Sequence, residues 1–345
     1  MALLEVQDLS VELQTHRGPA YAVRNVSFTL ERGASLGLVG ESGCGKSITV
    51  MALMGLLPEN ARVTGSIRLD GQELVGLAER ELCKLRGDRI GMIFQEPMTA
   101  LNPVHTIGRQ VAEPLRLHRG MGKAQALTQA VALLDRVGIP DAARRIDAYP
   151  HQFSGGQRQR ITIAMALACG PDLLIADEPT TALDVTIQRQ ILDLIRDLVA
   201  ERGMALMLIS HDLGVIAQNV QRMMVMYGGS VVESGPTTSV FANRTHPYTL
   251  GLFAARPGLR SAKGRRLATI PGTVPELVDL PPGCPFAGRC RFTIPQCNLQ
   301  LPPAYEVAPG HHARCIRLDL VAAEKEALLA PTPALPQRGG EELQP

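Results

Sequence analysis

A glycine-rich loop with a lysine and a serine lies early in the chain, and its residue types suit the binding of phosphate. Its eight residues are Gly40, Glu41, Ser42, Gly43, Cys44, Gly45, Lys46 and Ser47. Glycines at this spacing let the backbone turn tightly and point several N–H groups toward one anion. Lys46 is placed to reach the β- and γ-phosphates, and the Ser47 hydroxyl to bind Mg²⁺. The loop therefore predicts a nucleoside triphosphate as ligand.

Two carboxylates and a histidine follow apolar runs further along the chain. Asp177 and Glu178 end the run at residues 173–176. Asp177 is suited to hold the shell of a Mg²⁺ ion, and Glu178 to polarise an attacking water. His211 comes just after the apolar run at residues 204–209. A lone histidine is more often structural, but the carboxyl end of a strand is where open α/β sheets bind ligands.

A second glycine turn precedes a predicted helix in the middle of the chain. Residues 153–157 read Phe-Ser-Gly-Gly-Gln and are followed by basic and then apolar residues. The N–H groups at the start of a helix bind anions, so the turn predicts a second phosphate contact. Taken singly, it also fits an ordinary helix start with Ser154 as N-cap. The residues of this turn assigned to nucleotide binding are Ser154, Gly155, Gly156 and Gln157.

The elements that must position these groups follow from the apolar pattern. We predict strands at residues 21–30, 34–39 and 223–233, and helices at residues 48–57, 123–137 and 154–169. Asp70-Gly71 is a hairpin signal between further strands. From residue 171 to 235, strand and helix patterns alternate, which predicts an α/β fold with parallel strands.

In this order, the motifs resemble those of the ATP-binding subunits of ABC transporters. The phosphate loop comes first, followed by Gln95 after a strand, the turn at 153–157, the Asp177-Glu178 pair, Ala182-Leu183-Asp184 and His211. The resemblance is closest to the dipeptide/oligopeptide branch, which includes nickel importers. It rests on residues 94–103, 149–153, 175–188 and 246–249 and on a Cys-rich tail. The segment Met98-Thr99-Ala100 resembles the first of the two ATPases usual in such systems.

The resemblance implies that two such chains clamp ATP between them. Glu178 would be the general base, while Gln95 senses the metal and water, and His211 steadies the γ-phosphate. Mg²⁺ would be held by Ser47, Gln95 and Asp177. From the facing chain, Ser154 and Gly156 would donate to the γ-phosphate, and Asp184 would cross between the two chains.

The partners and location are also implied by the resemblance. We expect a second ABC ATPase subunit, with a heterodimer favoured, two membrane permease subunits and an extracytoplasmic solute-binding protein. The chain would act at the cytoplasmic face of the inner membrane as a peripheral subunit, driving uptake of dipeptides, oligopeptides or a related small solute. The alternative is a soluble ABC ATPase in DNA repair or translation. The single set of motifs and the absence of a long heptad run favour the transporter.

Composition agrees with a membrane-docked protein that does not cross the bilayer. The net charge of +2 gives no electrostatic footprint for nucleic acid. No apolar run approaches the ~20 residues that span a bilayer. The N-terminus lacks the positive flank and apolar region of a secretory signal.

The fold class predicted is therefore an α/β P-loop NTPase of ABC type with a helical subdomain and a Cys-rich C-terminal extension. Residues 1–255 would form the ATPase domain, with the helical subdomain at about 96–170 as in the family. Composition shifts to Pro, Gly and Cys after Arg256, so residues 256–325 would form the extension. Residues 326–345 are expected to be a disordered tail.

Four cysteines gather in the extension, whereas Cys44, Cys83 and Cys169 are scattered. The four are Cys284, Cys290, Cys297 and Cys315. Disulfides are rare in the cytosol, and a Pro-rich segment with few large apolar groups suits a metal staple. The wide spacing, together with the resemblance, predicts a [4Fe–4S] cluster. Zinc stays an alternative because His311 and His312 lie nearby in sequence. A second alternative is that the four cysteines are free, buried thiols that bind no metal.

The chain departs from the family at the adenine site. Family members usually stack an aromatic ring on adenine from an early loop. Here that window holds Leu13, His16 and Tyr21, with no aromatic side chain at the expected position. The contact to the base therefore has no assigned residue at this point.

Overall fold

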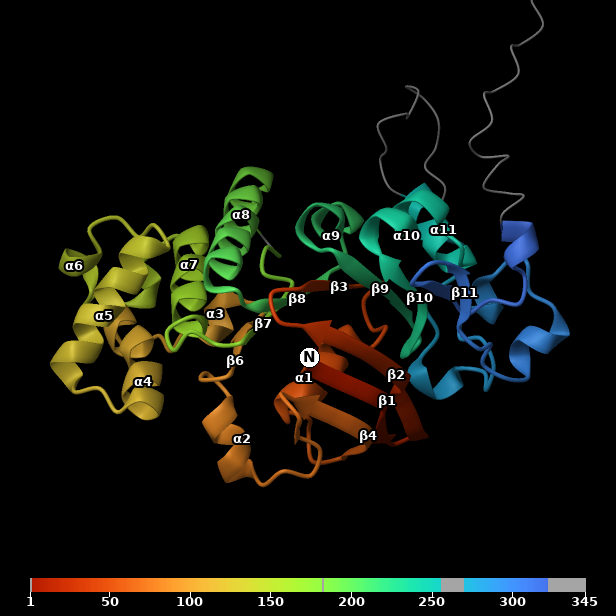
Figure 1. Cartoon of the computed structure of the whole chain (residues 1–345), viewed down its shortest axis with the longest axis horizontal. Coiled ribbons are helices and arrows are strands. Elements are labelled where there is room, and N and C mark those ends of the chain that lie inside the picture. The colour runs from red at the N-terminus through yellow and green to blue at the C-terminus, as the bar shows by residue number, and fades with distance from the viewer. Residues whose placement is uncertain (1, 182, 256–269, 322–345) are drawn as a thin grey trace, which may run out of the picture.

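The computed structural model describes residues 2–181, 183–255 and 270–321 (Figure 1). The expected disordered tail at 326–345 and Ala182 lie outside these ranges. Two β-sheets and a group of helices make up the described chain (Figure 1). Among its helices, none is long and apolar enough to cross a membrane.

The smaller sheet is antiparallel and is built mainly from the N-terminal strands. Its order is β2-β1-β4-β5, with bounds β1 Ala2–Thr15, β2 Gly18–Glu31, β4 Ala61–Leu69 and β5 Gln72–Glu73. The expected strand at 21–30 lies within β2. Asp70 and Gly71 both have positive φ, 52° and 81°, as the tight hairpin turn between β4 and β5 requires.

The larger sheet of the described chain has eight strands, and five adjacent strands among them run parallel to one another. The order is β11-β12-β10-β9-β3-β8-β7-β6. The bounds are β3 Ser35–Val39, β6 Ile90–Ile93, β7 Leu173–Asp177, β8 Ala205–Ser210, β9 Arg222–Tyr227, β10 Ser230–Pro236, β11 Tyr305–Ala308 and β12 His311–Ala313. Strands β6, β7, β8, β3 and β9 pair in parallel, which confirms the predicted α/β fold.

Helices surround the larger sheet, and several lie together at its β6 edge (Figure 1). Their bounds are α1 Lys46–Met54, α2 Glu79–Leu85, α3 Pro97–Ala100, α4 Ile107–Arg119, α5 Lys123–Arg136, α6 Ala142–Arg145, α7 Gly155–Ala166, α8 Val185–Arg202, α9 Leu213–Asn219, α10 Thr237–Asn243 and α11 Pro247–Ala254. Short 3₁₀ turns are η1 Pro150–Gln152, η2 Leu277–Asp279, η3 Ala287–Arg289 and η4 Pro295–Asn298. The helices expected at 123–137 and 154–169 are α5 and α7.

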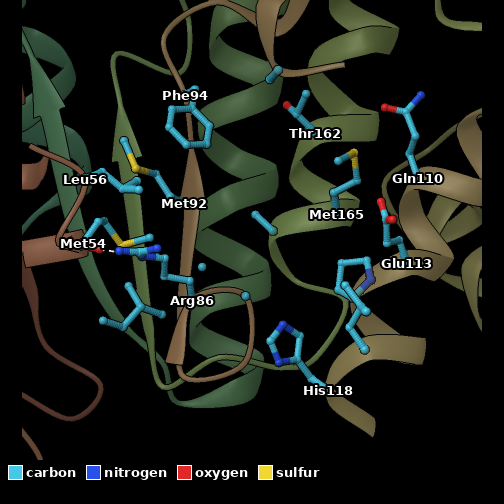
Figure 2. A pocket seen from close by; sticks show the side chains of 17 residues that line it. Met54, Leu56, Arg86, Met92, Phe94, Gln110, Glu113, His118, Thr162 and Met165 are labelled. Carbon is cyan, nitrogen blue, oxygen red and sulfur yellow. Dashed lines mark hydrogen bonds between the residues drawn. The ribbon is translucent and has the colours of Figure 1, made fainter. Parts of the chain in front are cut away.

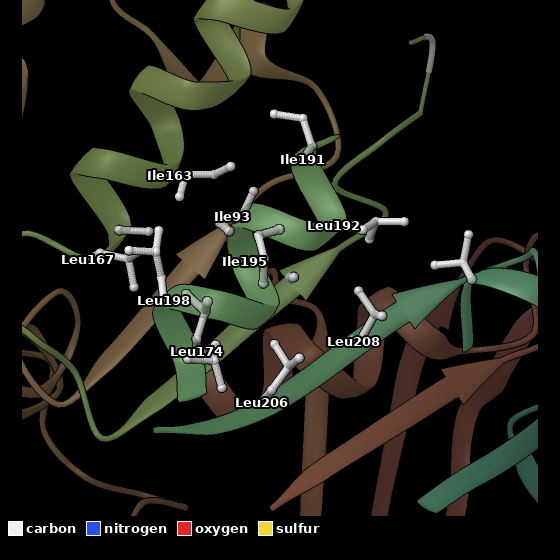
Figure 3. Packing of buried hydrophobic residues seen from close by; sticks show 14 of the residues in the cluster. Ile93, Ile163, Leu167, Leu174, Ile191, Leu192, Ile195, Leu198, Leu206 and Leu208 are labelled. Atoms are coloured by element: carbon white, nitrogen blue, oxygen red, sulfur yellow. The ribbon is translucent and has the colours of Figure 1, made fainter. Parts of the chain in front are cut away.

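The central strands are buried on both faces, which explains their near-continuous apolar sequence. On one face, Leu174 of β7 and Leu206 of β8 pack against Ile195 of α8, with α7 alongside (Figure 3). On the other face, the alternate residues Ile175 and Met207 pack toward the antiparallel sheet. The parallel strands are thus held rigidly, and their carboxyl ends provide a fixed base for the loops that follow.

The Cys-rich extension joins the larger sheet directly. Strand β12 pairs antiparallel with β10, with Glu233 opposite Ala313 and Ser234 opposite His312. Beside this pairing, Nε2 of His311 lies 2.8 Å from Oε1 of Glu233, and both side chains are fully buried. The extension is thus part of the sheet edge, whereas its composition alone indicated a separate segment.

Candidate nucleotide-binding site

The phosphate loop connects β3 to α1, as the strand and helix patterns predicted. Gly45 has a φ of 104°, and a Cβ atom there would lie 2.4 Å from the Ala22 carbonyl oxygen. A Cβ atom at Gly40 would lie 2.3 Å from the Met226 carbonyl oxygen. A side chain at either position would displace backbone, so glycine is needed for the loop to close. Cys44 is buried within the loop, with its Sγ atom 3.8 Å from Lys46 Nζ.

Lys46 and Asp177 are the buried charged groups beside the loop. Lys46 Nζ donates to the carbonyl oxygens of Gly40 and Glu41 at 2.8 and 3.0 Å. Burial raises the pKa of Asp177, and the nearby Glu178 charge adds to this, while a hydrogen bond from Ser47 opposes it. Asp177 Oδ1 is buried without a hydrogen-bond partner in the described chain. A carboxylate oxygen left unpaired beside a serine hydroxyl fits a Mg²⁺ seat.

Three side chains converge on one oxygen of Glu178. Oε2 lies 3.1 Å from His211 Nδ1, accepts from the Thr181 hydroxyl at 3.0 Å and accepts from Gln95 Nε2 at 3.3 Å. Glu178 has a φ of 44°, a left-handed conformation that is strained for a non-glycine residue. The convergence fixes the direction of this carboxylate. It brings together Gln95, Glu178 and His211, which lie on three separate loops after β6, β7 and β8.

Six residues of the phosphate loop, Gln95, Glu178 and His211 line one cavity of about 680 Å³, whereas Asp177 and Thr181 are not among its lining residues. Its lining comprises Glu41, Ser42, Gly43, Gly45, Lys46, Ser47, Ile48, Gln95, Glu178, His211, Val274 and Leu277. The last two belong to the extension and had no signal in the sequence, because isolated apolar residues in a Pro-rich loop carry no period. Thr181 was also missed as a partner of Glu178.

The glycine turn before α7 lies outside this cavity. Ser154 Oγ accepts from the Gln157 N–H at 3.3 Å, and Gln157 Oε1 accepts from the Ser154 N–H at 3.2 Å. This is a capping box, so the ordinary role of Ser154 as N-cap is present. Asp184 caps α8 through the Ile187 N–H. Ser154, Gly155, Gly156, Gln157 and Asp184 are therefore not brought to the phosphate loop of their own chain.

A second cavity of about 350 Å³ lies between the sheet edge and helices α4 and α7 (Figure 2). From the core side it is lined by Met54, Leu56, Arg86, Met92 and Phe94, and from the helices by Gln110, Glu113, Leu117, His118, Thr162 and Met165. Phe94 is directly bonded to Gln95, so a single peptide bond joins this groove to the nucleotide cavity.

The four cysteines of the extension line one small cavity of about 20 Å³. Burial raises the pKa of Cys284 to about 12 and that of Cys315 to about 11. Neither His311 nor His312 lines this cavity, and His311 instead contacts Glu233 and Ser239. Within the described ranges, no three His, Cys, Asp or Glu side chains are arranged to hold a metal ion. The two histidines that the zinc alternative named therefore lie elsewhere, and the histidine beside the four thiols is the buried His246.

Comparisons with known proteins agree with this geometry. Residues 23–181 match the family model "ABC transporter", and residues 232–297 match "Oligopeptide/dipeptide transporter, C-terminal region". The chain is 50% identical over 333 residues to a Brucella melitensis protein named for peptide import and ATP binding, covering 93% of this chain and 98% of the relative.

A second named relative and a solved structure are also similar to this chain. The Salmonella typhimurium protein named oligopeptide transport ATP-binding protein OppD is 50% identical, over 91% of this chain and 93% of the relative. The solved dimeric ATP-binding cassette MJ0796, in a post-hydrolysis state with ADP and Pi, has a TM-score of 0.61 at 29% identity. It covers 68% of this chain and 98% of the cassette.

The match to a relative over nearly its whole length, the phosphate loop and the cassette fold lead to one conclusion. The chain belongs to the ATP-binding proteins of ABC transporters, in the branch with the oligopeptide/dipeptide transporter C-terminal region, and is an ATPase coupled to transport.

Proposed function

We propose that this chain is the ATP-hydrolysing motor subunit of an importer for dipeptides, oligopeptides or a related small solute. The observation that carries the proposal is the convergence of Gln95, Thr181 and His211 on Glu178 at the rim of the phosphate-loop cavity. The peptide import names of the relatives support the solute class. The alternative of a soluble ATPase in DNA repair or translation receives no support from these comparisons.

Each group in the cavity has a role in phosphoryl transfer. Lys46 and the loop N–H groups would bind the β- and γ-phosphates. Ser47 and Asp177, with Gln95, would hold Mg²⁺, which neutralises phosphate charge when bound. Glu178 would accept the proton of the attacking water, because its carboxylate is oriented by three donors and faces the cavity. His211 would steady the γ-phosphate and orient Glu178.

A second chain is required to complete the ATP site. Ser154, Gly155, Gly156 and Gln157 open α7 outside the cavity, and Asp184 opens α8. The N–H groups at the start of α7 suit a phosphate carried by a facing chain. We propose a pair of ATPase subunits in which the phosphate loop of one faces this turn of the other, with a heterodimer favoured.

The groove beside Phe94 is proposed as the docking site of the membrane subunits. It is mostly apolar, with Arg86 and Glu113 as charged groups at its sides. Its link to Gln95 would let ATP-driven closure reach two permease subunits. An extracytoplasmic binding protein would deliver the solute, and the chain would lie peripherally at the cytoplasmic face of the inner membrane. No nucleic acid is involved.

We propose a division into residues 1–255 as ATPase domain, including a helical subdomain at about 96–170, and residues 256–325 as extension. The helices α4, α5 and α7 within 96–170 support the subdomain. The match of residues 232–297 to a C-terminal region model supports a C-terminal part with its own sequence signature, and this match already begins within β10.

Reconstitution tests the proposed function. Purified alone, the chain should hydrolyse ATP poorly, because it carries only half of each site. Activity should rise when a partner ATPase and two permeases are added, and rise again with a peptide-loaded binding protein. Full, concentration-independent turnover by a rigorously monomeric sample would contradict the proposal.

Two leucine variants test the proposed docking groove, one within the groove and one outside it. Leu117 lines the groove and is 73% exposed, whereas Leu299 lies in the extension and is 71% exposed. Leu117→Asp would bury an unpaired carboxylate against the permeases, so affinity for them should fall at least about tenfold. Leu299→Asp should leave it unchanged. Co-purification with detergent-solubilised permeases measures both, and equal behaviour of the two variants would move the docking site elsewhere.

We also propose that Cys284, Cys290, Cys297 and Cys315 bind a structural [4Fe–4S] cluster. What supports this is that all four thiols line one cavity with no competing carboxylate. A cavity of about 20 Å³ is too small for a cluster, so binding would require the thiols to move apart and lose their protons. Four thiols are therefore the right type of ligand for a [4Fe–4S] cluster, but the cavity between them must widen before a cluster can bind.

Anaerobic purification checks the cluster. The wild-type chain should be brown and carry about four irons, the number expected for one such cluster. Cys297→Ser should lose nearly all the iron, while Cys83→Ser, at an exposed cysteine outside the extension, should keep it. Stoichiometric zinc without iron would reassign the site to zinc, and a metal-free chain with an ordered extension would leave four free thiols.

A further inference from the structure

A segment of the extension, residues 270–282, passes over the nucleotide cavity; we call it the strap. Its first part is fastened to the phosphate loop by Arg289, whose side chain is only 7% exposed. Arg289 Nη1 donates to Glu41 Oε2 at 2.7 Å, and Nε donates to the Pro271 carbonyl oxygen at 2.9 Å. One buried guanidinium thus joins the strap to the loop that binds phosphate.

The second part of the strap is fastened to the hairpin between β1 and β2. Arg17, near the turn of that hairpin, donates to Glu276 and Asp279, each at 2.6 Å. Arg24 of β2 donates to the Pro281 carbonyl oxygen at 3.3 Å. Exposed ion pairs are individually weak. Contacts at both ends nevertheless fix where the residues between them lie.

Between these fastenings, Val274 and Leu277 line the nucleotide cavity. The loop residues, Lys46 and Ser47 account for the phosphates, and Gln95, Glu178 and His211 for the reacting end. A nucleotide carries its ribose and base beyond its phosphates. Apart from Ile48 of α1, the apolar side chains of the strap form the part of the lining that none of these phosphate-directed groups supplies.

The early hairpin does not provide an aromatic ring for this purpose. In the described part of the chain, no aromatic side chain lines the cavity. Tyr21 is 47% exposed on β2, and Leu13 packs against the buried cluster between the sheets. The strap is bound to this same hairpin through Arg17. It therefore occupies the neighbourhood in which an early-loop aromatic would meet the base.

We propose that Val274 and Leu277 form the wall against which the base of the bound nucleotide packs, so that the extension contributes the base contact to the ATP site of its own chain. The inference rests on the proposed function, because it concerns the same cavity. Neither side chain has a hydrogen-bonding group, so the wall would contact the face of a base without reading its edge. ATP and GTP should therefore bind within a few-fold of each other, because apolar contacts discriminate weakly between such edges.

Equilibrium binding to the full purified chain tests the wall. In the double variant Val274→Ala, Leu277→Ala, affinity for MgATP should fall about tenfold, as expected for lost apolar burial. Affinity for Mg-tripolyphosphate, which has no base, should stay unchanged. Leu299→Ala, the same change at an exposed leucine of the extension, should alter neither. Unchanged ATP affinity, or equal losses for ATP and tripolyphosphate, would overturn the proposal, whereas wild type that binds no ATP would refute the proposed function itself.

Photolabelling tests the same proposal on the wild-type chain, so that no substitution can disturb folding. With 8-azido-ATP, the reactive group sits on the purine, so tryptic mapping reports what lies beside the base. Label in the peptide of residues 267–289 is expected, and competition by ATP should remove it. Label confined to the peptide of residues 18–24, which contains Tyr21, would return the base to the hairpin and overturn the proposal.

Discussion

Glu178→Gln should lower ATP hydrolysis by the assembled transporter by roughly 10²–10⁴-fold, the range for loss of a general base. ATP binding should persist, because the phosphate loop, Lys46 and Ser47 are untouched. The amide can still accept hydrogen bonds from Thr181 and Gln95, so the local geometry should survive. What is lost is the capacity to take a proton. The variant should accumulate in the ATP-bound, closed pair.

Single-turnover hydrolysis and gel filtration with ATP measure these two effects. Glu201→Gln is the matched control, because this glutamate on α8 pairs with Arg136 and lies outside the cavity. It should hydrolyse ATP at the wild-type rate. If Glu178→Gln did so too, in the assembled complex, Glu178 would have no role as base and Asp177 or bound phosphate would have to replace it.

The second large effect concerns stability. His311→Ala should lower the free energy of unfolding by about 1–3 kcal/mol, the cost of leaving a buried acceptor oxygen of Glu233 without its histidine hydrogen-bond partner. Glu233 is fully buried and accepts from His311 and from the N–H groups of Thr245 and His246. His312→Ala is the control, since the next residue of a strand points to the opposite face. Urea titrations of the two variants should differ clearly, and equal midpoints would contradict this account.

The same region predicts acid sensitivity. Burial lowers the pKa of His246 from 6.5 to about 4. Between these values the unfolded chain binds more protons than the folded one, so stability should fall as the pH drops from 6.5 to 4. Burial alone would raise the pKa of Glu233, but its hydrogen bonds, led by His311, lower it. That contribution is present above the unfolded pKa and is lost as the pH falls through the folded one. Urea midpoints from pH 6.5 to 4 measure the His246 effect, and a flat profile there would contradict it. The loss of the Glu233 contribution should appear on further acidification, below its unfolded pKa of 4.5.

What could be predicted from the sequence was what is encoded locally. The phosphate loop is one run of eight residues between a strand and a helix, so type and spacing sufficed. Gln95, Glu178 and His211 each end a parallel strand, and such ends meet at one edge of a sheet. The sequence therefore predicted that Gln95 and His211 lie near Glu178 before any distance was known.

What escaped prediction depends on contacts between distant segments. Arg289 and Glu41 are 248 positions apart, and neither carries a motif that signals the other. His311 seemed available to a metal because residue type gives no direction, yet its ring points to Glu233. Val274 and Leu277 were inconspicuous for the same reason, since a Pro-rich loop has no period from which a facing side can be inferred.

The pairing of β10 with β12 also sets an order of events during synthesis. His311 follows Glu233 by 78 positions, so on the ribosome the carboxylate waits about 4–16 s for its partner at typical elongation rates. For that interval β10 ends the sheet with open N–H and C=O groups, the kind of edge that recruits other chains. The nascent protein therefore passes through a vulnerable stage that ends only when β12 emerges and pairs with β10.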